Sequence, residues 1–166
     1  MNEFIHLHTH SHYSLLDAAA TVEGLVAAAV AQRMPAVALT DHGVLFGAIE
    51  FYKKARKAGV KPIIGFEAYI LTKGDRRERS VSADLAQRGR TKSPYHHILL
   101  LAKDRVGYRN LMKLCTIGHE EGYYYKPRID VEVLSQYREG LLATSACPGG
   151  VVSAHLVQGD FEAARE

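Results

Sequence analysis

The chain has 166 residues and a formal net charge of +3, with 47% hydrophobic and 23% charged residues. This balance is typical of a folded globular domain and excludes a disordered chain or a collagen-like repeat. No apolar run reaches the roughly 18 residues that a membrane span needs, and the N-terminus lacks the pattern of a signal peptide. The two cysteines, Cys115 and Cys147, make no disulfide framework, so we expect a cytoplasmic protein without membrane contact.

Hydrophobic patterning predicts strands and helices that alternate through most of the chain. In chain order they are strand 4–10, helix 21–32, strand 35–40, helix 45–58, strand 61–71, strand 96–102, helix 105–119, helix 131–137, strand 141–145 and a helix from residue 151 that still runs at residue 166. Thr21 is a suitable N-cap, and Gly59 is a suitable stop for the second helix. The pattern favours an α/β fold with a parallel sheet and right-handed βα units.

Unusual polar residues gather near the C-terminal ends of the predicted strands, among them His10, His42, Glu67 and Cys147. In β/α barrels this end carries the active site, so the placement favours a barrel over an open sheet. Five strands are too few to close such a barrel. We therefore expect the chain to be the first part of a larger domain.

Residues 73–93 carry seven basic and three acidic side chains and little hydrophobic pattern. We expect an exposed basic loop. Its cations could contact a phosphate backbone, although a solvated loop without a ligand is the alternative. The candidates for nucleic-acid binding are Arg76, Arg77, Arg79, Arg88, Arg90 and Lys92.

Four of the nine histidines, His6, His8, His10 and His12, alternate near the N-terminus. Two histidines at positions i and i+2 of a strand point the same way, about 6–7 Å apart. His8 and His10 could therefore hold one metal ion or flank a pair of them. A strand with solvated histidines is the alternative, and His6 could instead orient a ligand.

Further residues of ligand type follow or interrupt the apolar strands: Asp17, His42, Glu67, His97 and Cys147. Each has a simpler explanation as a cap, a core histidine or a buried thiol, but a lone carboxylate inside the apolar run around Glu67 needs a partner or a cation. The mixed nitrogen and oxygen set suits two or three divalent ions (Zn, Mn, Mg or Fe), which activate water for phosphoester cleavage. Asp41 could orient a ligand or move a proton. Cys147 as a nucleophile is a weaker alternative.

The stretches "HLHTHSHYSLLDAA", "ALTDHG" and "GFEAY" resemble the opening motifs of the PHP (polymerase and histidinol phosphatase) family. Longer stretches such as "LLAKDRVGYRNLMKL" and "YYYKPRIDVEVL" narrow the resemblance to the N-terminal PHP domains of bacterial DNA polymerase III alpha subunits. The resemblance covers the chain except residues 73–93.

The resemblance implies a distorted (βα)7 barrel with a trinuclear metal centre, of which residues 1–166 would be the first five βα units of a single PHP domain. Carried over by position, the ligands are His8, His10, Asp17, His42, Glu67 and His97. Cys147 stands where many family phosphoesterases have histidine, and the last Asp and His ligands of the family have no counterpart in the chain.

The resemblance also implies a parent DNA-directed DNA polymerase, with DNA and other replicase subunits as partners. This region could supply a metal-dependent 3′–5′ exonuclease or phosphoesterase activity. The alternatives are a non-catalytic, metal-stabilised scaffold and a free-standing phosphoesterase such as a histidinol phosphatase.

Overall fold

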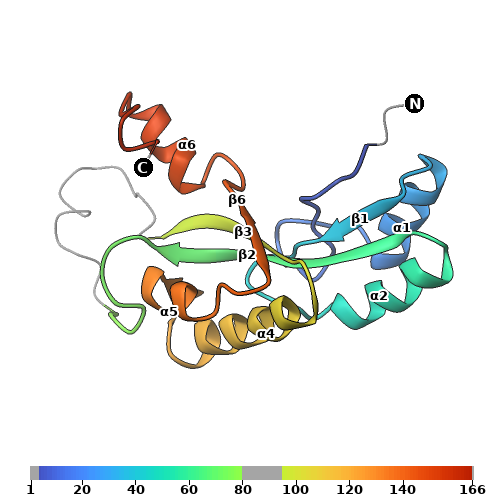
Figure 1. Ribbon diagram of the computed structural model, residues 1–166, viewed down its shortest axis with the longest axis horizontal. Coiled ribbons are helices and arrows are strands. Elements are labelled where there is room, and N and C mark those ends of the chain that lie inside the picture. The colour runs from blue at the N-terminus through green and yellow to red at the C-terminus, as the bar shows by residue number, and fades with distance from the viewer. Residues whose placement is uncertain (1–3, 80–94, 166) are drawn as a thin grey trace.

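The computed structural model describes residues 4–79 and 95–165, arranged around one long central strand (Figure 1). The helices are α1 (Val22–Ala31), α2 (Ala48–Lys57), α4 (Arg105–Glu120), α5 (Val131–Gln136) and α6 (Val151–Val157). The strands are β1 (Ala36–Leu39), β2 (Lys61–Leu71), β3 (His96–Ala102), β4 (Tyr123–Tyr124), β5 (Lys126–Asp130) and β6 (Leu141–Thr144). The prediction of an α/β fold is confirmed at the level of a sheet covered by helices.

The sheet is mixed rather than parallel. Its strand order is β4-β5-β2-β3-β6, with β1 also paired to β2. β1 and β5 run parallel to β2, whereas β3 runs antiparallel to β2 and β6 antiparallel to β3. The prediction of an all-parallel sheet is therefore wrong. The sequence has no helical pattern between β2 and β3, and antiparallel neighbours need no crossover helix.

Most element boundaries agree with the predictions, and the exceptions lie near the chain ends and around β4. Residues 4–10 form no regular strand, although the carbonyls of His6 and Thr9 accept hydrogen bonds from the backbone of Ala38 and Thr40, both at 2.9 Å. The predicted helix to residue 166 is wrong, because α6 ends at Val157. The short β4–β5 hairpin lies between the predicted helices 105–119 and 131–137, where no strand was predicted.

Two large hydrophobic cores flank the central strand, and a third, smaller cluster contains Ala38, Leu99 and Leu101. The first packs α1 and α2 against β1, with Phe51 and Val22 fully buried. The side chain of Thr21 caps α1 by accepting from the backbone of Gly24 at 3.0 Å, as predicted. The second core packs α4 and α5 against β2, β3 and β5, on the side of the sheet where α4 lies in Figure 1.

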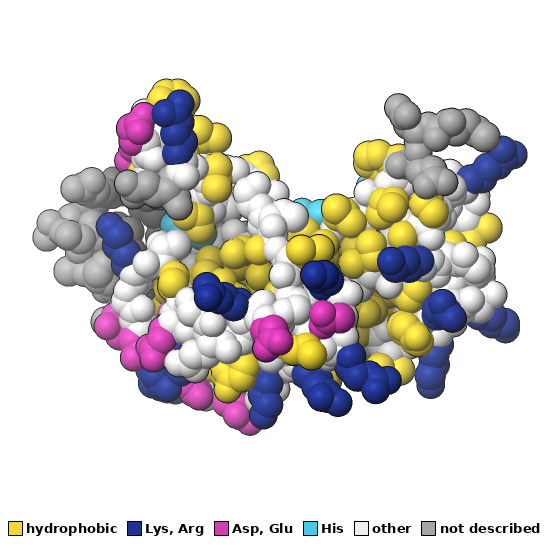
Figure 2. All heavy atoms as spheres, viewed as in Figure 1, with side chains coloured by type: hydrophobic (Ala, Val, Ile, Leu, Met, Phe, Trp, Pro, Cys, Tyr) yellow, Lys and Arg dark blue, Asp and Glu magenta, His cyan; other side chains and the backbone are white. Residues whose placement is uncertain are grey.

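Alternation along β2 separates the second core from the polar cluster described below. Phe66, Ala68 and Ile70 belong to the core that packs against α4. Since side chains alternate across a strand, Glu67 and Tyr69 face the other side of the sheet. In the space-filling view the molecule is hollowed between α6 and the N-terminal segment, with histidine side chains at the bottom of the hollow (Figure 2). Within the described ranges, no helix is both long and apolar enough to cross a membrane.

Candidate metal centre

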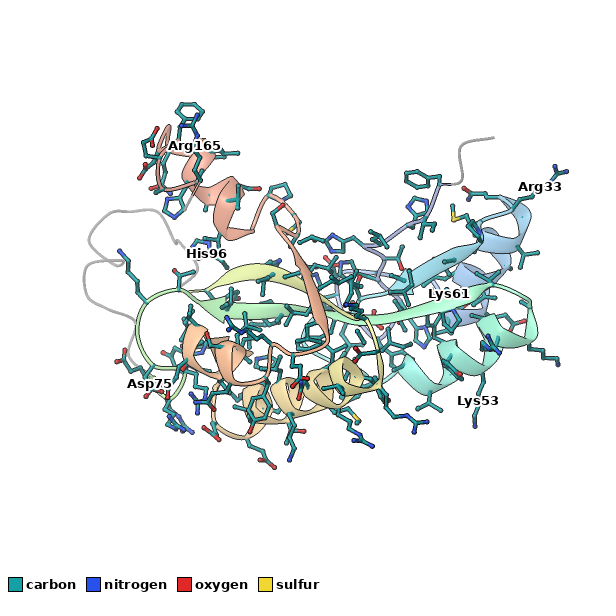
Figure 3. All side chains as sticks on the ribbon, viewed as in Figure 1. Arg33, Lys53, Lys61, Asp75, His96 and Arg165 are labelled. Carbon is teal, nitrogen blue, oxygen red and sulfur yellow. The ribbon has the colours of Figure 1, made fainter. Side chains whose placement is uncertain are left out.

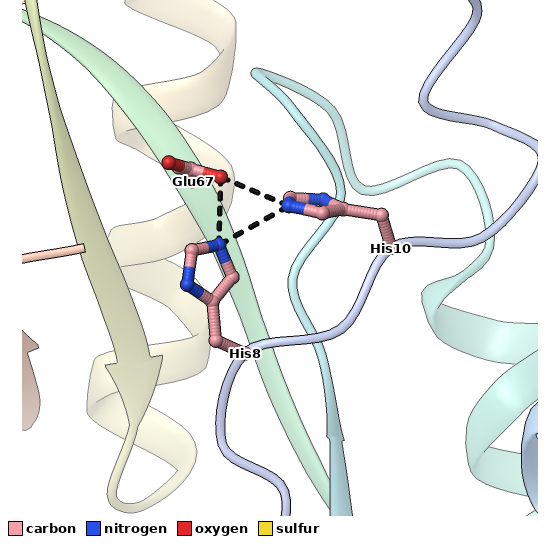
Figure 4. A group of neighbouring side chains, drawn as sticks. All are labelled: His8, His10 and Glu67. Atoms are coloured by element: carbon pink, nitrogen blue, oxygen red, sulfur yellow. Dashed lines mark hydrogen bonds and ion pairs between the residues drawn. The ribbon is translucent and has the colours of Figure 1, made fainter. Parts of the chain in front are cut away.

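Glu67 is the centre of a cluster of imidazole side chains. Its side chain is only 1% exposed. Its Oε2 atom lies 2.8 Å from Nε2 of His8 and 3.0 Å from Nε2 of His10 (Figure 4). The two Nε2 atoms are themselves 3.1 Å apart. Three potential ligand atoms from two distant segments therefore converge on one point.

Two further histidines complete the surroundings of Glu67. Nδ1 of His97 lies 2.8 Å from Oε1, and Nδ1 of His42 lies 3.4 Å from Oε2. Nε2 of His42 reaches Oδ2 of Asp17 at 3.3 Å, while the His42 ring stacks on the ring of His10 with centroids 4.3 Å apart. Six of the seven residues predicted as metal ligands thus lie in one continuous cluster.

Cys147, the seventh predicted ligand, sits at the edge of the cluster. Its Sγ atom lies 3.3 Å from Nδ1 of His97. Burial raises the pKa of the Cys147 thiol, and the nearby carboxylate of Glu67 adds to this. A neutral thiol in contact with a histidine is a weak ligand until a metal ion displaces its proton.

The backbone brings these side chains together beside the middle of β2, where Glu67 lies, rather than at the C-terminal ends of the strands as predicted. His42 forms a parallel bridge to Glu67 directly after β1, and His97 forms one to Gly150 in front of α6. Gly43, which follows His42, has φ +65, and a Cβ there would lie 2.7 Å from the ring of Pro127. The glycine in "TDHG" therefore lets the β1 end approach β5 closely.

Asp41 does not reach the cluster directly but is linked to it by Ser14. Its buried carboxylate accepts from the backbone and hydroxyl of Ser11, at 2.6 and 2.8 Å, and from the hydroxyl of Ser14 at 2.7 Å. The Ser14 hydroxyl also lies 3.4 Å from Nδ1 of His10 and accepts from the backbone of His42 at 3.1 Å. Sequence reasoning missed both serines, since a short polar residue carries no distinctive signal.

The electrostatics of the cluster favour an ionised Glu67. Burial alone would raise the pKa of this carboxyl, but hydrogen bonds from His10, His97 and His8 outweigh burial and hold the pKa well below its usual range. Burial opposes protonation of His10, yet the Glu67 carboxylate leaves the pKa of His10 raised. Burial lowers the pKa of His42, and Glu67 only partly opposes this. The cluster therefore combines a fixed anion with imidazoles of different basicity.

The arrangement fits divalent metal ions. Ligand atoms about 2.0–2.2 Å from a tetrahedral ion lie roughly 3–3.5 Å from one another. The ligand atoms of His8, His10 and Glu67 have this spacing, at 2.8 to 3.1 Å. Three overlapping groups have ligand atoms that all lie within 4.8 Å of one another: His8, His10 and Glu67; His10, Asp17 and His42; and His42, Glu67 and His97. In addition, Nδ1 of His42 is buried without a hydrogen bond. Within the described ranges, Glu67 pairs with histidines and with no lysine or arginine.

The predicted nucleic-acid contacts do not form one exposed surface. Arg76 is 6% exposed and buried against Glu121 and Asp130, so the prediction that it lies on an exposed loop is wrong. Its partners lie 45 and 54 residues further along the chain, where the local charge pattern gives no sign of them. Arg77 is exposed and pairs with Asp75 and Glu121.

The other residues predicted to contact nucleic acid, and His6, lie outside the histidine cluster or outside the described residues. Arg79 is exposed, whereas Arg88, Arg90 and Lys92 lie outside the described residues. Figure 3 labels Asp75 on the turn that follows β2, beyond the end of this strand opposite Lys61. His6 is exposed and packs on Phe4 rather than on the cluster.

Comparisons with known proteins agree with the motifs. The PHP domain family matches residues 6–166. The chain is 48% identical over 164 residues to the DNA polymerase III subunit alpha of Borreliella burgdorferi, and 44% identical over 164 residues to that of Aquifex aeolicus. Each match covers 99% of this chain but 14% of the relative. A solved amidohydrolase from Chromobacterium violaceum is 25% identical, with a TM-score of 0.43, over 66% of this chain and 32% of that one.

The fold and the cluster define a mixed α/β protein with a histidine- and carboxylate-rich site of the type that holds divalent metals. The chain belongs to the PHP domain family, which confirms the resemblance carried by its motifs. It spans about one seventh of the length of the alpha subunits to which it is similar.

Proposed function

We propose that the chain is the N-terminal PHP domain of a bacterial DNA polymerase III alpha subunit and that its cluster holds two or three divalent metal ions. The observation that carries the proposal is Glu67, a buried carboxylate on which four imidazoles converge. The similarity to two alpha subunits supports DNA and other replicase subunits as partners of the parent protein. In this proposal, residues 1–166 are the first part of a distorted (βα)7 barrel, and the antiparallel β3 is one of its distortions.

The residues suit hydrolysis of a phosphodiester. Bound Zn, Mn, Mg or Fe would supply a Lewis acid and a water of lowered pKa. His8, His10 and Glu67 would hold one ion, and Asp17, His42 and His97 would extend the site to a second or third. We propose Cys147 as a ligand at the edge of the cluster and Asp41 as the residue that fixes the His10 ring through Ser14.

The test of catalysis is the metal-dependent shortening of a 5′-labelled single DNA strand from its 3′ end. Protein treated with a chelator should lose this activity and regain it when one of the candidate ions is added back. His10→Ala should prevent this metal-dependent recovery of activity. His155→Ala is the matched control, because His155 lies on α6 outside the cluster and its side chain is partly exposed.

A structural role is the second candidate, and one feature favours it. The ligands come from the N-terminal segment, the end of β1, and β2 and β3, so bound metal would connect the regions around both hydrophobic cores. If added metal raises the melting temperature of the protein but leaves the labelled DNA strand at full length, the protein has the structural role and not the exonuclease activity. Shortening that follows the added metal would establish the enzyme.

A further inference from the structure

A pocket of about 470 Å³ opens beside the cluster, and most of its wall is not used by the proposed metal ligands. Asp17, His42 and His97 line it, so the pocket is continuous with the cluster. The wall also includes the exposed side chains of Phe46 and Tyr125. Its volume lies within the range of small-molecule sites in proteins.

Two of the exposed residues in this wall have a strained backbone. Tyr125, at the turn of the β4–β5 hairpin, has φ +60 and is 77% exposed. Leu16, in the loop before α1, has φ +67 and is fully exposed. A bulky side chain in the left-handed region costs conformational energy, and such strain gathers at functional sites. Both side chains are largely exposed, so burial offsets little of that cost.

The neighbours of Tyr125 hold its ring in place and leave most of it exposed. The rings of Tyr124 and Tyr125 pack edge-to-face with centroids 4.6 Å apart. The guanidinium of Arg128 lies 5.3 Å from the centroid of the Tyr124 ring and supports that ring in turn. Tyr123, also in the wall, stacks near His119 at 6.2 Å. The hairpin therefore presents two tyrosines whose rings are supported from within the fold.

The charges of the pocket suit a phosphate ester. Among the described residues that line the pocket, Lys126 supplies the basic side chain, and its amine lies 5.4 Å from the centroid of the Tyr69 ring. The carboxylate in the lining is Asp17, itself a proposed metal ligand. The wall thus combines aromatic and aliphatic surface with one cation next to the cluster.

We propose that this pocket holds one unpaired nucleobase, with Tyr123 and Tyr125 as base-stacking residues that make the site specific for unpaired strand ends. The inference rests on the proposed function, since it places the phosphodiester of that nucleotide at the cluster. Aromatic rings bind any nucleobase through its flat face.

The geometry also explains why a paired end fits poorly. A base that stacks on protein rings inside a pocket has left its own helical stack, which costs least for an unpaired or mismatched base. Tyr123 and Tyr125 therefore act as positioning residues that select the substrate, while the chemistry stays with the cluster.

The test is equilibrium binding, by fluorescence anisotropy, of a short 5′-fluorescein-labelled DNA single strand and of a blunt hairpin duplex to the full chain. Tyr125→Gly removes the ring and relieves the left-handed strain, so this variant should fold at least as well as the parent. Tyr125→Phe retains the ring. Tyr52→Ala is the control for Tyr123→Ala, because Tyr52 is similarly exposed, at 50% against 54%, and lines a different groove on α2.

Tyr125→Gly and Tyr123→Ala should each weaken binding of the single strand about 10-fold or more. Tyr125→Phe and Tyr52→Ala should leave it unchanged, and duplex binding should not respond to any of the four. The inference would be overturned if Tyr125→Gly bound the single strand as tightly as the unsubstituted chain does, or if it lost affinity equally for the single strand and the duplex. Metal content measured on the same samples separates the proposals. A chain without metal contradicts the proposed function, whereas a metal-loaded chain indifferent to Tyr125→Gly contradicts only the pocket.

Discussion

Ser14 and Asp41 are joined by a buried hydrogen bond of 2.7 Å between hydroxyl and carboxylate. Through its second contact, at 3.4 Å, the same hydroxyl meets Nδ1 of His10. Asp41 thus acts on His10 indirectly, through the Ser14 hydroxyl. Residues that hydrogen-bond to a metal-binding histidine in this way fix the orientation and tautomer of its ring. The link runs from the end of β1 to the irregular N-terminal segment and holds that segment in place without regular strand pairing.

Ser14→Ala should weaken both the fold and the site. Asp41 would lose one of three hydrogen bonds while remaining buried, which costs about 1–3 kcal/mol of unfolding free energy. Loss of a partner behind a ligand typically lowers metal affinity by about 10- to 100-fold. Urea unfolding and metal titration measure the two effects. Ser135→Ala on the exposed face of α5 is the control, and equal behaviour of the two variants would contradict the assigned role.

Arg76→Ala should destabilise the protein far more than Arg77→Ala. Removing Arg76 leaves the buried carboxylate of Asp130 without its cation, and breaking a buried pair costs about 3–5 kcal/mol. The exposed Arg77 should contribute about 1 kcal/mol or less. Chemical denaturation of both variants gives the comparison. Similar losses from the two would show that Arg76 is not the structural residue.

Asp130 should make stability depend on pH in the acid range. Burial alone would raise its pKa, but hydrogen bonds from the backbone of Val133 and Arg76 and from the Arg76 guanidinium lower it below the ordinary 3.8. A carboxyl whose folded pKa is depressed contributes stability that is complete above the unfolded value and is lost as pH falls through the folded pKa.

The free energy of unfolding of the unsubstituted chain should therefore fall more steeply than that of Asp130→Asn as pH falls below about 3.8. Unfolding free energies measured from pH 5 downwards give the two slopes. Asp75→Asn, at an exposed aspartate in the same region, should keep the parent slope. Parallel slopes for the parent and Asp130→Asn would show that Asp130 titrates normally.

The sequence predicted local features well because local residues determine them. The bounds of β2 and β3 and the cap at Thr21 follow from patterns within a few residues. Glu67 could also be singled out, since a carboxylate in an apolar run has few explanations.

Features that depend on distant partners were not predictable from local patterns. Strand direction was wrong for β3, because apolar runs do not encode whether a neighbour is parallel. Burial of Arg76 depends on Glu121 and Asp130, both far along the chain. Tyr125 belongs to a hairpin whose left-handed turn carries no glycine or asparagine signal.

The most direct test of the metal centre is the number of divalent ions bound per chain, by elemental analysis, in the parent, in Glu67→Gln and in Glu50→Gln. Glu50 is a partly exposed glutamate on α2 and serves as the control. We expect two or three ions in the unsubstituted chain and in Glu50→Gln, and fewer in Glu67→Gln, because the amide removes the negative charge on which His8 and His10 converge. Equal metal content in all three proteins, or none in any, would contradict this expectation.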